Sequence, residues 1–248
     1  MLVRNNSNKT LKPASGPPTE LANQDAVWSE FKYRRGSEIF GEAEPADYVY
    51  RVREGAVRTH KLLSDGRRQI GAFHLPGDIF GVDNGEVHRF TAEAIVHTTV
   101  WIAKRRSLFC GLAKSEIATA KSVRDLITKS LEHVENHLLL LGRQNSLEKV
   151  AAFLAEMDRR SGQPAVMVLP MSRHDIADYL GLSLETVSRA MSMLRNEGIL
   201  SFIGKTQRKI ILHDRFKLDQ RAKSSDPAAI VSSLRSSQYG AARKNPHP

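Results

Sequence analysis

Residues 172–190, SRHDIADYLGLSLETVSRA, are the most informative stretch of the chain. Apolar residues recur at helical spacing on both sides of Gly181, which predicts two short helices joined by a tight turn. Ser172, with Asp175 three residues later, predicts the cap of the first helix, and Ser183 predicts the cap of the second. The inward residues would be Ile176, Ala177 and Leu180 in the first helix, and Val187, Ala190, Met191 and Leu194 in the second.

The second helix would carry polar side chains on the outer face of its N-terminal half. In the major groove of DNA, an arginine can donate to guanine O6 and N7, and a glutamate can accept from cytosine N4. Glu185, Ser188 and Arg189 are therefore the predicted base-reading residues. Taken alone, the stretch fits an ordinary helical hairpin with a solvated polar face equally well.

The residues that follow favour DNA binding over a structural hairpin. Residues 203–212, IGKTQRKIIL, predict a β-hairpin with a basic tip, which is typical of the wing in a winged helix-turn-helix domain. Lys205, Arg208 and Lys209 would lie over phosphates. Such contacts fix the register of a protein on the duplex but carry no sequence information.

The block from Ser172 to Thr206 resembles the DNA-binding domain of the Crp/Fnr regulators, especially the Fnr and FixK branch, through the Glu-x-x-Ser-Arg run at residues 185–189. In that branch these residues read TTGA-type half-sites of an inverted repeat. The resemblance places Glu185 and Arg189 at the G·C pair and Ser188 near thymine. The DNA-backbone contacts expected in this block and in the rest of the wing are Ser172, Arg173, His174, Ser183, Thr186, Lys205, Arg208 and Lys209.

The composition indicates a globular protein with room for two small domains. The chain has 248 residues, of which 41% are hydrophobic and 26% charged. No apolar run is long enough to span a bilayer, and residues 1–21 lack the apolar core of a signal peptide, so we expect a cytoplasmic protein with no membrane partner. The formal net charge of +10 favours a polyanionic partner such as double-stranded DNA.

The N-terminal part has a different sequence pattern, with short strand-like runs separated by turns that contain glycine. This pattern predicts a small β-roll or jelly-roll. It resembles the sensory, cyclic-nucleotide-binding-like domain of the same family, with the turn PGDIFG at residues 76–81. The strand-like runs are residues 48–52, 57–62, 69–73 and 98–102, and the turns are residues 53–55, 64–66 and 75–78.

The roll departs from the family members that bind cyclic nucleotides. In those members the turn continues with a glutamate for the ribose, and an arginine followed by a small hydroxyl residue and alanine surrounds the phosphate. Here Val82 follows the turn and the bulky Phe90 follows Arg89. We therefore expect no cyclic nucleotide, no cofactor and a protein that acts without an effector.

Metal chemistry is also not expected. An iron–sulfur cluster needs several thiolates, and Cys110 is the single cysteine, so it reads as a small buried hydrophobe or a redox-sensing thiol. Haem stays open, because one axial histidine can suffice and the roll contains several histidines. His133 and His137 have the i, i+4 spacing of a zinc pair but no third ligand beside them, so no metal site is predicted.

A long helical stretch lies between the roll and the DNA-reading block. Its apolar residues alternate at spacings of three and four, interrupted only by Arg124, as in a coiled-coil seam. The stripe could pack on the roll, but the family uses this helix to dimerise, so we expect a parallel homodimer on a palindromic operator. The predicted interface residues are Ile117, Ala120, Ile127, Leu131, Val134, Leu138 and Leu141.

Together these patterns predict an α+β chain in five parts. They are a flexible arm (1–27), the β-roll (28–112), the dimerisation helix (113–145), the winged helix-turn-helix (146–216) and a basic polar tail (217–248). The resemblance implies a transcription activator that contacts RNA polymerase in low-oxygen respiration or nitrogen fixation. A ligand-gated regulator is the main alternative. A cupin enzyme is a distant one, because the roll lacks the His-x-His pattern of a cupin metal site, and we expect no enzyme activity.

Overall fold

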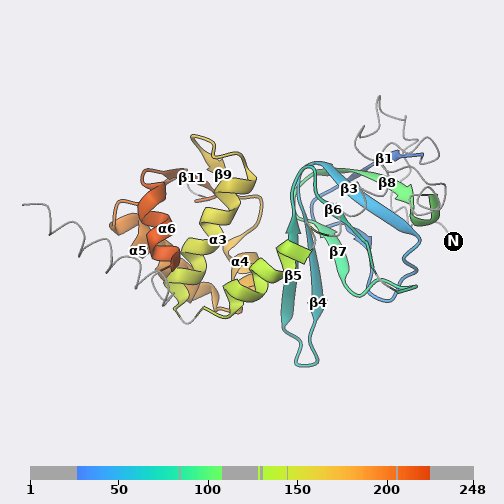
Figure 1. Cartoon of the computed structure of the whole chain (residues 1–248), viewed down its shortest axis with the longest axis horizontal. Helices are drawn as coiled ribbons and strands as arrows, with labels where there is room; N and C mark the ends of the chain where they lie inside the picture. Colours follow the sequence, from blue (N-terminus) through green and yellow to red (C-terminus); the bar gives the residue numbers. More distant parts are fainter. Residues whose placement is uncertain are drawn as a thin grey trace, which may run out of the picture. The chain divides into compact units, whose positions relative to one another are not determined.

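The computed structural model describes residues 27–83, 85–107, 128, 131–143, 145–204 and 206–223. The chain divides between Glu135 and Asn136 into two compact units, which are described separately (Figure 1). Within the described residues, no helix is both long and apolar enough to cross a membrane. Residues 1–26 of the expected arm lie outside them, as do Cys110, Ile117, Ala120, Arg124, Ile127 and Lys205.

The described part of the N-terminal unit consists mainly of two antiparallel four-stranded sheets, in the orders β1-β8-β3-β6 and β2-β7-β4-β5. The predicted strand runs fall within β3, β4, β5 and β8, so the expected β-roll is confirmed. The strands are β1 (Ser29–Tyr33), β2 (Glu38–Phe40), β3 (Tyr48–Glu54), β4 (Val57–Leu62), β5 (Arg68–His74), β6 (Ile79–Phe80), β7 (Thr91–Ala94) and β8 (Thr98–Lys104).

Aromatic rings fill part of the roll's core. The Phe40 ring centroid lies 5.0 Å from that of Tyr50, and the Tyr50 centroid lies 5.2 Å from that of Phe80. His88 is buried, stacks on Phe40 at 3.6 Å and makes a 2.7 Å contact through Nδ1 with an Asp83 oxygen. The core cluster contains Ile39, Phe40, Tyr50, Val52, Val57, Phe80, Ala92, Val100 and Ile102.

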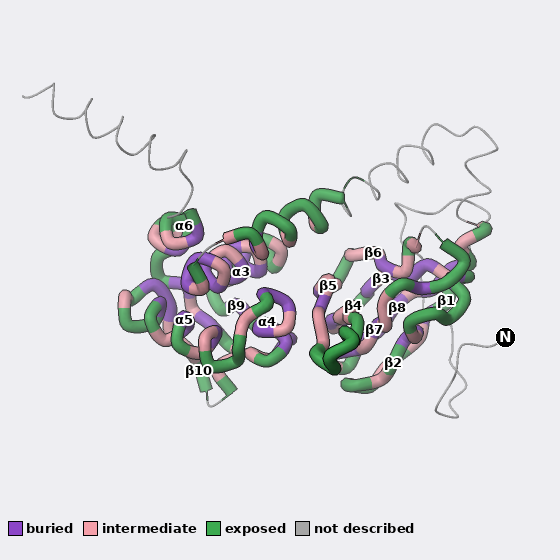
Figure 2. The backbone as a smooth tube through the Cα atoms, turned by 90° about the horizontal axis from the view of Figure 1, so that it is seen from below, coloured by how far each residue is buried: buried purple, intermediate pink, exposed green. Residues whose placement is uncertain are grey.

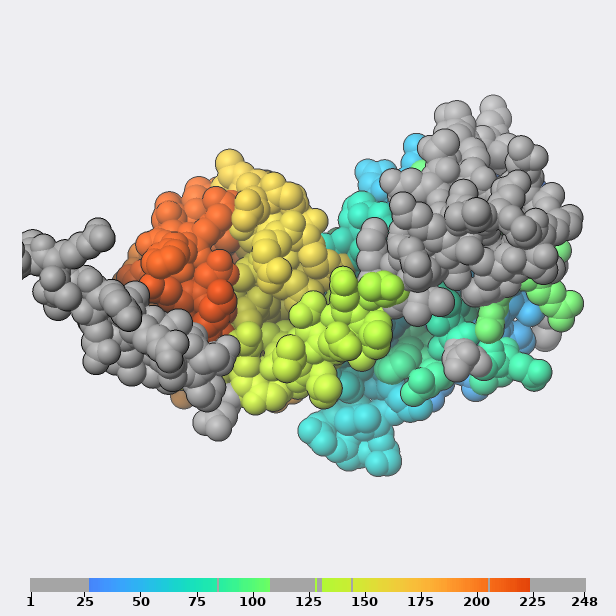
Figure 3. All heavy atoms as spheres, in the orientation of Figure 1, coloured from blue at the N-terminus to red at the C-terminus, as the bar shows by residue number. Residues whose placement is uncertain are grey.

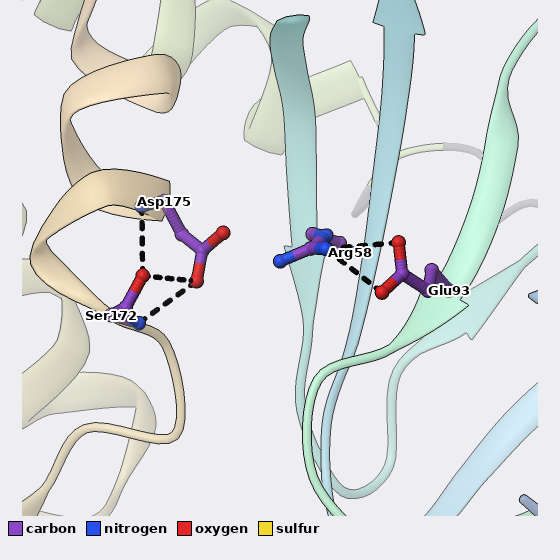
Figure 4. A network of polar contacts seen from close by, with 4 residues as sticks. All are labelled: Arg58, Glu93, Ser172 and Asp175. Atoms are coloured by element: carbon purple, nitrogen blue, oxygen red, sulfur yellow. Dashed lines mark hydrogen bonds and ion pairs between the residues drawn. The ribbon is translucent and has the colours of Figure 1, made fainter. Parts of the chain in front are cut away.

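A cross-strand ion pair joins β4 to β7. Arg58 and Glu93 are directly opposite each other in the register of these strands. Arg58 Nη2 lies 2.8 and 2.9 Å from the two carboxylate oxygens (Figure 4). Opposite charges at facing positions stabilise a sheet by about 0.2–1 kcal/mol.

The C-terminal unit combines helices with a small antiparallel sheet of order β10-β11-β9. It begins within a helix at residues 131–141, and α3 then packs against both α5 and α6. This is the predicted winged helix-turn-helix arrangement. Its elements after residue 141 are α3 (Ser146–Arg160), β9 (Met167–Val168), α4 (Arg173–Leu180), α5 (Leu184–Asn196), β10 (Leu200–Ile203), β11 (Lys209–Leu212) and α6 (Arg215–Lys223).

The start of the expected basic tail is instead the packed helix α6. Leu218 and Ala222 are buried, and α6 lies against α3. Arg215 donates to both oxygens of the buried Asp158 at 2.7 and 3.1 Å, and to the carbonyl of Pro164 at 2.9 Å. The polar sequence of α6 hides this packing because its partners lie some 60 residues earlier. Residues 224–248 lie outside the described part.

Candidate nucleic-acid interface

The first helix of the reading motif begins at a complete capping box. Ser172 Oγ accepts the backbone N–H of Asp175 at 3.1 Å, and an Asp175 carboxylate oxygen accepts the backbone N–H of Ser172 at 2.9 Å (Figure 4). The Ser172 hydroxyl also donates to the same oxygen at 2.7 Å. This arrangement satisfies N-terminal backbone donors of α4 that have no partner within the helix.

The turn between α4 and α5 follows the sequence prediction. Gly181 has a left-handed backbone, with φ of 63°, and its N–H donates to the carbonyl of Ala177. Glycine suits this position because it adopts positive φ without steric cost. Ser183 then caps α5, since its Oγ accepts the backbone N–H of Thr186 at 3.1 Å.

The two helices bury the faces that the spacing predicts. In α4 the inward residues Ile176, Ala177 and Leu180 are buried, together with Tyr179, which the pattern did not single out. In α5 the buried residues are Val187, Ala190, Met191 and Leu194. The polar side of α5 is consequently left facing outward.

Glu185 and Arg189 dominate that outer side of α5. Their side chains are 71% and 77% exposed and form an i, i+4 ion pair, with Arg189 Nη2 2.5 Å from Glu185 Oε1. An exposed helical pair of this kind is worth about 0.3–0.5 kcal/mol, so it breaks at little cost when a better partner arrives. Ser188, the third predicted base-reading residue, is half-buried beside them, as is Thr186.

At the start of α4, Arg173 is engaged with the wing. Its guanidinium lies 5.2 Å from the ring centroid of Phe202 on β10 and donates to the side-chain oxygen of Gln207. Burial lowers the pKa of Arg173, with nearby Arg195 adding to the effect. The neighbouring His174 has a 66% exposed side chain and lies 3.9 Å from an Asp178 oxygen.

The basic residues of the wing differ in exposure. Lys209 is exposed at the start of β11 and pairs in register with Ile203 and with Val168 of β9. Arg208 is half-buried and donates to the carbonyl of Pro170 at 3.3 Å. The contact of Gln207 with Arg173, described above, brings the wing beside the first turn of α4. Lys205, at the tip, is not described.

The turn expected to face a ligand in the roll packs against Tyr50. Gly81 has φ of +75°, and a Cβ on it would lie 2.6 Å from the Tyr50 ring. Arg89 is exposed, and its backbone N–H approaches an Asp83 oxygen at 3.4 Å. Within the described residues, no group of three or more histidine, cysteine, aspartate or glutamate side chains is arranged to hold a metal ion.

Comparison with known proteins assigns both units. The family model of the Crp-like helix-turn-helix domain matches residues 148–221, and that of the cyclic nucleotide-binding domain matches residues 30–113. The nitrogen fixation regulation protein FixK of Azorhizobium caulinodans is 44% identical over 191 residues, covering 75% of this chain and 76% of the relative. The chain belongs to the Crp/Fnr family. It is a FixK-like DNA-binding transcription regulator and not an enzyme, so the cupin alternative is wrong.

Two further relatives support the assignment to the FixK branch of the Crp/Fnr family. FixK of Rhizobium meliloti is 42% identical over 169 residues, covering 68% of this chain and 76% of the relative. The solved structure of FixK2 from Bradyrhizobium japonicum superposes with a TM-score of 0.74 at 54% identity. It covers 78% of this chain and 96% of that chain. The predicted fold of the Crp/Fnr regulators is thus confirmed.

Proposed function

We propose that this Crp/Fnr regulator binds a TTGA-type inverted repeat as a homodimer and activates transcription by contacting RNA polymerase. The outer face of α5 carries the proposal, because Glu185 and Arg189 are exposed there while the opposite side of the helix is buried. Ser188 would complete the base contacts. The proposed backbone contacts are Ser172, Arg173, His174, Ser183, Thr186, Lys205, Arg208 and Lys209.

An exposed apolar stripe supports dimerisation. Leu131, Val134 and Leu138 are 56%, 62% and 69% exposed at coiled-coil spacing on the helix of residues 131–141, and Leu141 is half-buried. Figure 2 draws most of this helix as exposed, and its yellow-green atoms lie at the surface in Figure 3. A second copy would cover this stripe. A two-fold dimer would place two recognition helices about 34 Å apart on successive major grooves.

We further propose that no effector or cofactor is needed. Val82 and Phe90 stand where a cyclic nucleotide would need a glutamate and a small hydroxyl residue, and Phe40, Tyr50 and Phe80 occupy the core. The amount or modification of the protein would then set its activity. Selective DNA binding that required an added compound, or a purified protein carrying a chromophore, would support the ligand-gated alternative instead.

The names of two relatives support a proposal for the biological role. Two proteins called nitrogen fixation regulation protein FixK are 44% and 42% identical to this chain. We propose a corresponding role in the cytoplasm, in the control of nitrogen fixation or low-oxygen respiration genes.

Binding of the purified, ligand-free protein to DNA tests this function. The two probes are a TTGA-type inverted repeat and a duplex of the same composition with both half-sites scrambled, at physiological salt. Specific sites of such readers are typically bound about 10³-fold or more tightly than random DNA. Equal affinity for both duplexes in the absence of any effector would contradict the proposed function.

A further inference from the structure

The helix at residues 131–141 ends against α4 through one histidine. His137 Nε2 lies 2.9 Å from the carbonyl oxygen of Tyr179, in the last turn of α4. The two side-chain rings stack in parallel, with centroids 3.9 Å apart and an interplanar angle of 3°. Tyr179 is only 1% exposed, and its ring centroid lies 5.8 Å from that of Phe153 on α3.

The position of Tyr179 explains why its carbonyl accepts this contact. The last carbonyls of an α-helix have no N–H partner within the helix, and α4 ends at Leu180 before the left-handed Gly181. Because a carbonyl can only accept, His137 Nε2 must carry the hydrogen. Burial raises the pKa of Tyr179 above its ordinary value, so the stacked ring is a neutral phenol.

The residues just after His137 are fixed to the same unit. Leu140 is buried, and a Cβ on Gly181 would lie 3.9 Å from a Leu141 methyl group. Arg143 donates to the carbonyl of Ala222, in the last turn of α6. The segment 137–143 therefore supplies donors to the C-terminal carbonyls of two helices of the DNA-binding unit.

We propose that His137 is a positioning residue for DNA reading, which holds the helix end at residues 136–141 in one orientation against α4. This inference rests on the proposed function, because it requires a dimer. Leu138, the residue after His137, belongs to the proposed dimer seam. The two recognition helices of a dimer must match the spacing of two half-sites. A fixed angle between residues 136–141 and α4 would select one spacing, and a loose helix end would accept several.

The test compares three operators and three variants at His137. The operators are the inverted repeat and versions with one base pair inserted or removed at its centre. His137→Ala removes both contacts, His137→Gln keeps a donor, and His137→Phe keeps a ring that can stack. Asn136→Ala is the control, because Asn136 is an exposed residue on the same helix.

The contact of His137 with Tyr179, called the clamp below, predicts a change in spacing preference as well as in affinity. We expect His137→Ala to lose about tenfold in affinity for the unaltered repeat, from the lost hydrogen bond and ring contact, while its binding to the altered repeats changes less. His137→Gln and His137→Phe should each restore part of the preference, and Asn136→Ala should match the wild type. A purely structural role would lower the folded fraction without changing the ratio among the three operators.

Two results would separate failure of the clamp from failure of the proposed function. Wild-type spacing preference in folded His137→Ala, checked by circular dichroism, would overturn the clamp. Absence of selectivity in the wild type would instead contradict the proposed operator. In that case, hydrogen exchange on the free protein tests the positioning role of His137. The backbone amides of residues 180–183 should exchange faster in His137→Ala than in the wild type. Unchanged exchange would overturn the proposal.

Discussion

At the residue scale, the reading face of α5 is defined by a few exposed polar side chains. Glu185 and Arg189 form an ion pair with each other in the free protein. The proposed contacts with a G·C pair in the major groove would require both side chains to turn toward the base edges. The ion pair is weak enough to exchange for such contacts.

Arg189→Ala should abolish selective binding. The variant loses the fork that would bind guanine, which we expect to cost about 1–3 kcal/mol per half-site, while its affinity for a scrambled duplex changes little. Fluorescence anisotropy on both duplexes measures the two affinities. Arg35→Ala is the control, because Arg35 is an exposed arginine between β1 and β2 of the roll. Wild-type selectivity in Arg189→Ala would contradict the proposed docking of α5.

Ser172→Ala should destabilise the reading domain. Loss of the capping box is expected to lower the free energy of unfolding by about 1 kcal/mol, with urea denaturation as the measurement. Ser192→Ala provides a comparison, because Ser192 lies within α5, away from its cap, and its hydroxyl donates to the carbonyl of Ser188 at 2.9 Å. Equal stability of Ser172→Ala and the wild type would show that the cap contributes nothing measurable.

At the element scale, the helix-turn-helix was predictable and the supports around it were not. Caps, the turn glycine and the buried stripes of α4 and α5 are local signals that a single sequence carries. The partners of Arg173, His137 and Arg215 lie between about 30 and 60 residues away in the chain, where no local pattern indicates them. For the same reason α6 resembled a polar tail, because α3 provides the surface that buries it.

Lys209→Ala should weaken binding to specific and random DNA by similar factors. Lys209 is exposed on the wing, and loss of one phosphate contact is expected to reduce the slope of log affinity against log salt by about 1. Titrations at several salt concentrations measure this slope. Lys32→Ala is the control, because Lys32 is an exposed lysine on β1 of the roll. A loss confined to the specific duplex would assign Lys209 to base reading.

At the scale of the whole molecule, the proposed dimer would determine how long a DNA sequence the protein reads. One recognition helix covers only a short half-site, and two-fold symmetry doubles the sequence that is read. The proposed seam rests on the spacing of three and four that is visible in the sequence. The exposure of its described residues is what leaves it available to a second copy.

Leu138→Glu should convert the dimer into monomers. A carboxylate in an apolar seam is costly to bury, so we expect dissociation at micromolar concentration and loss of operator binding. Analytical ultracentrifugation measures the mass. Leu139→Glu is a close control, because Leu139 is 68% exposed compared with 69% for Leu138 but lies off the stripe. A Leu138→Glu protein that stays dimeric would place the interface elsewhere.

The pairing of Glu185 with Arg189 also bears on how the protein searches a genome. A reading face whose charges offset each other has little hold on the phosphates of random DNA, where the wing would provide most of the attraction. The protein would then slide along other sequences without the phosphate contacts that an unpaired arginine would make. Under the proposed docking, Arg189 would leave Glu185 only where a guanine and a cytosine offer both side chains better partners, so the same two residues would set the speed of the search and the accuracy with which it stops.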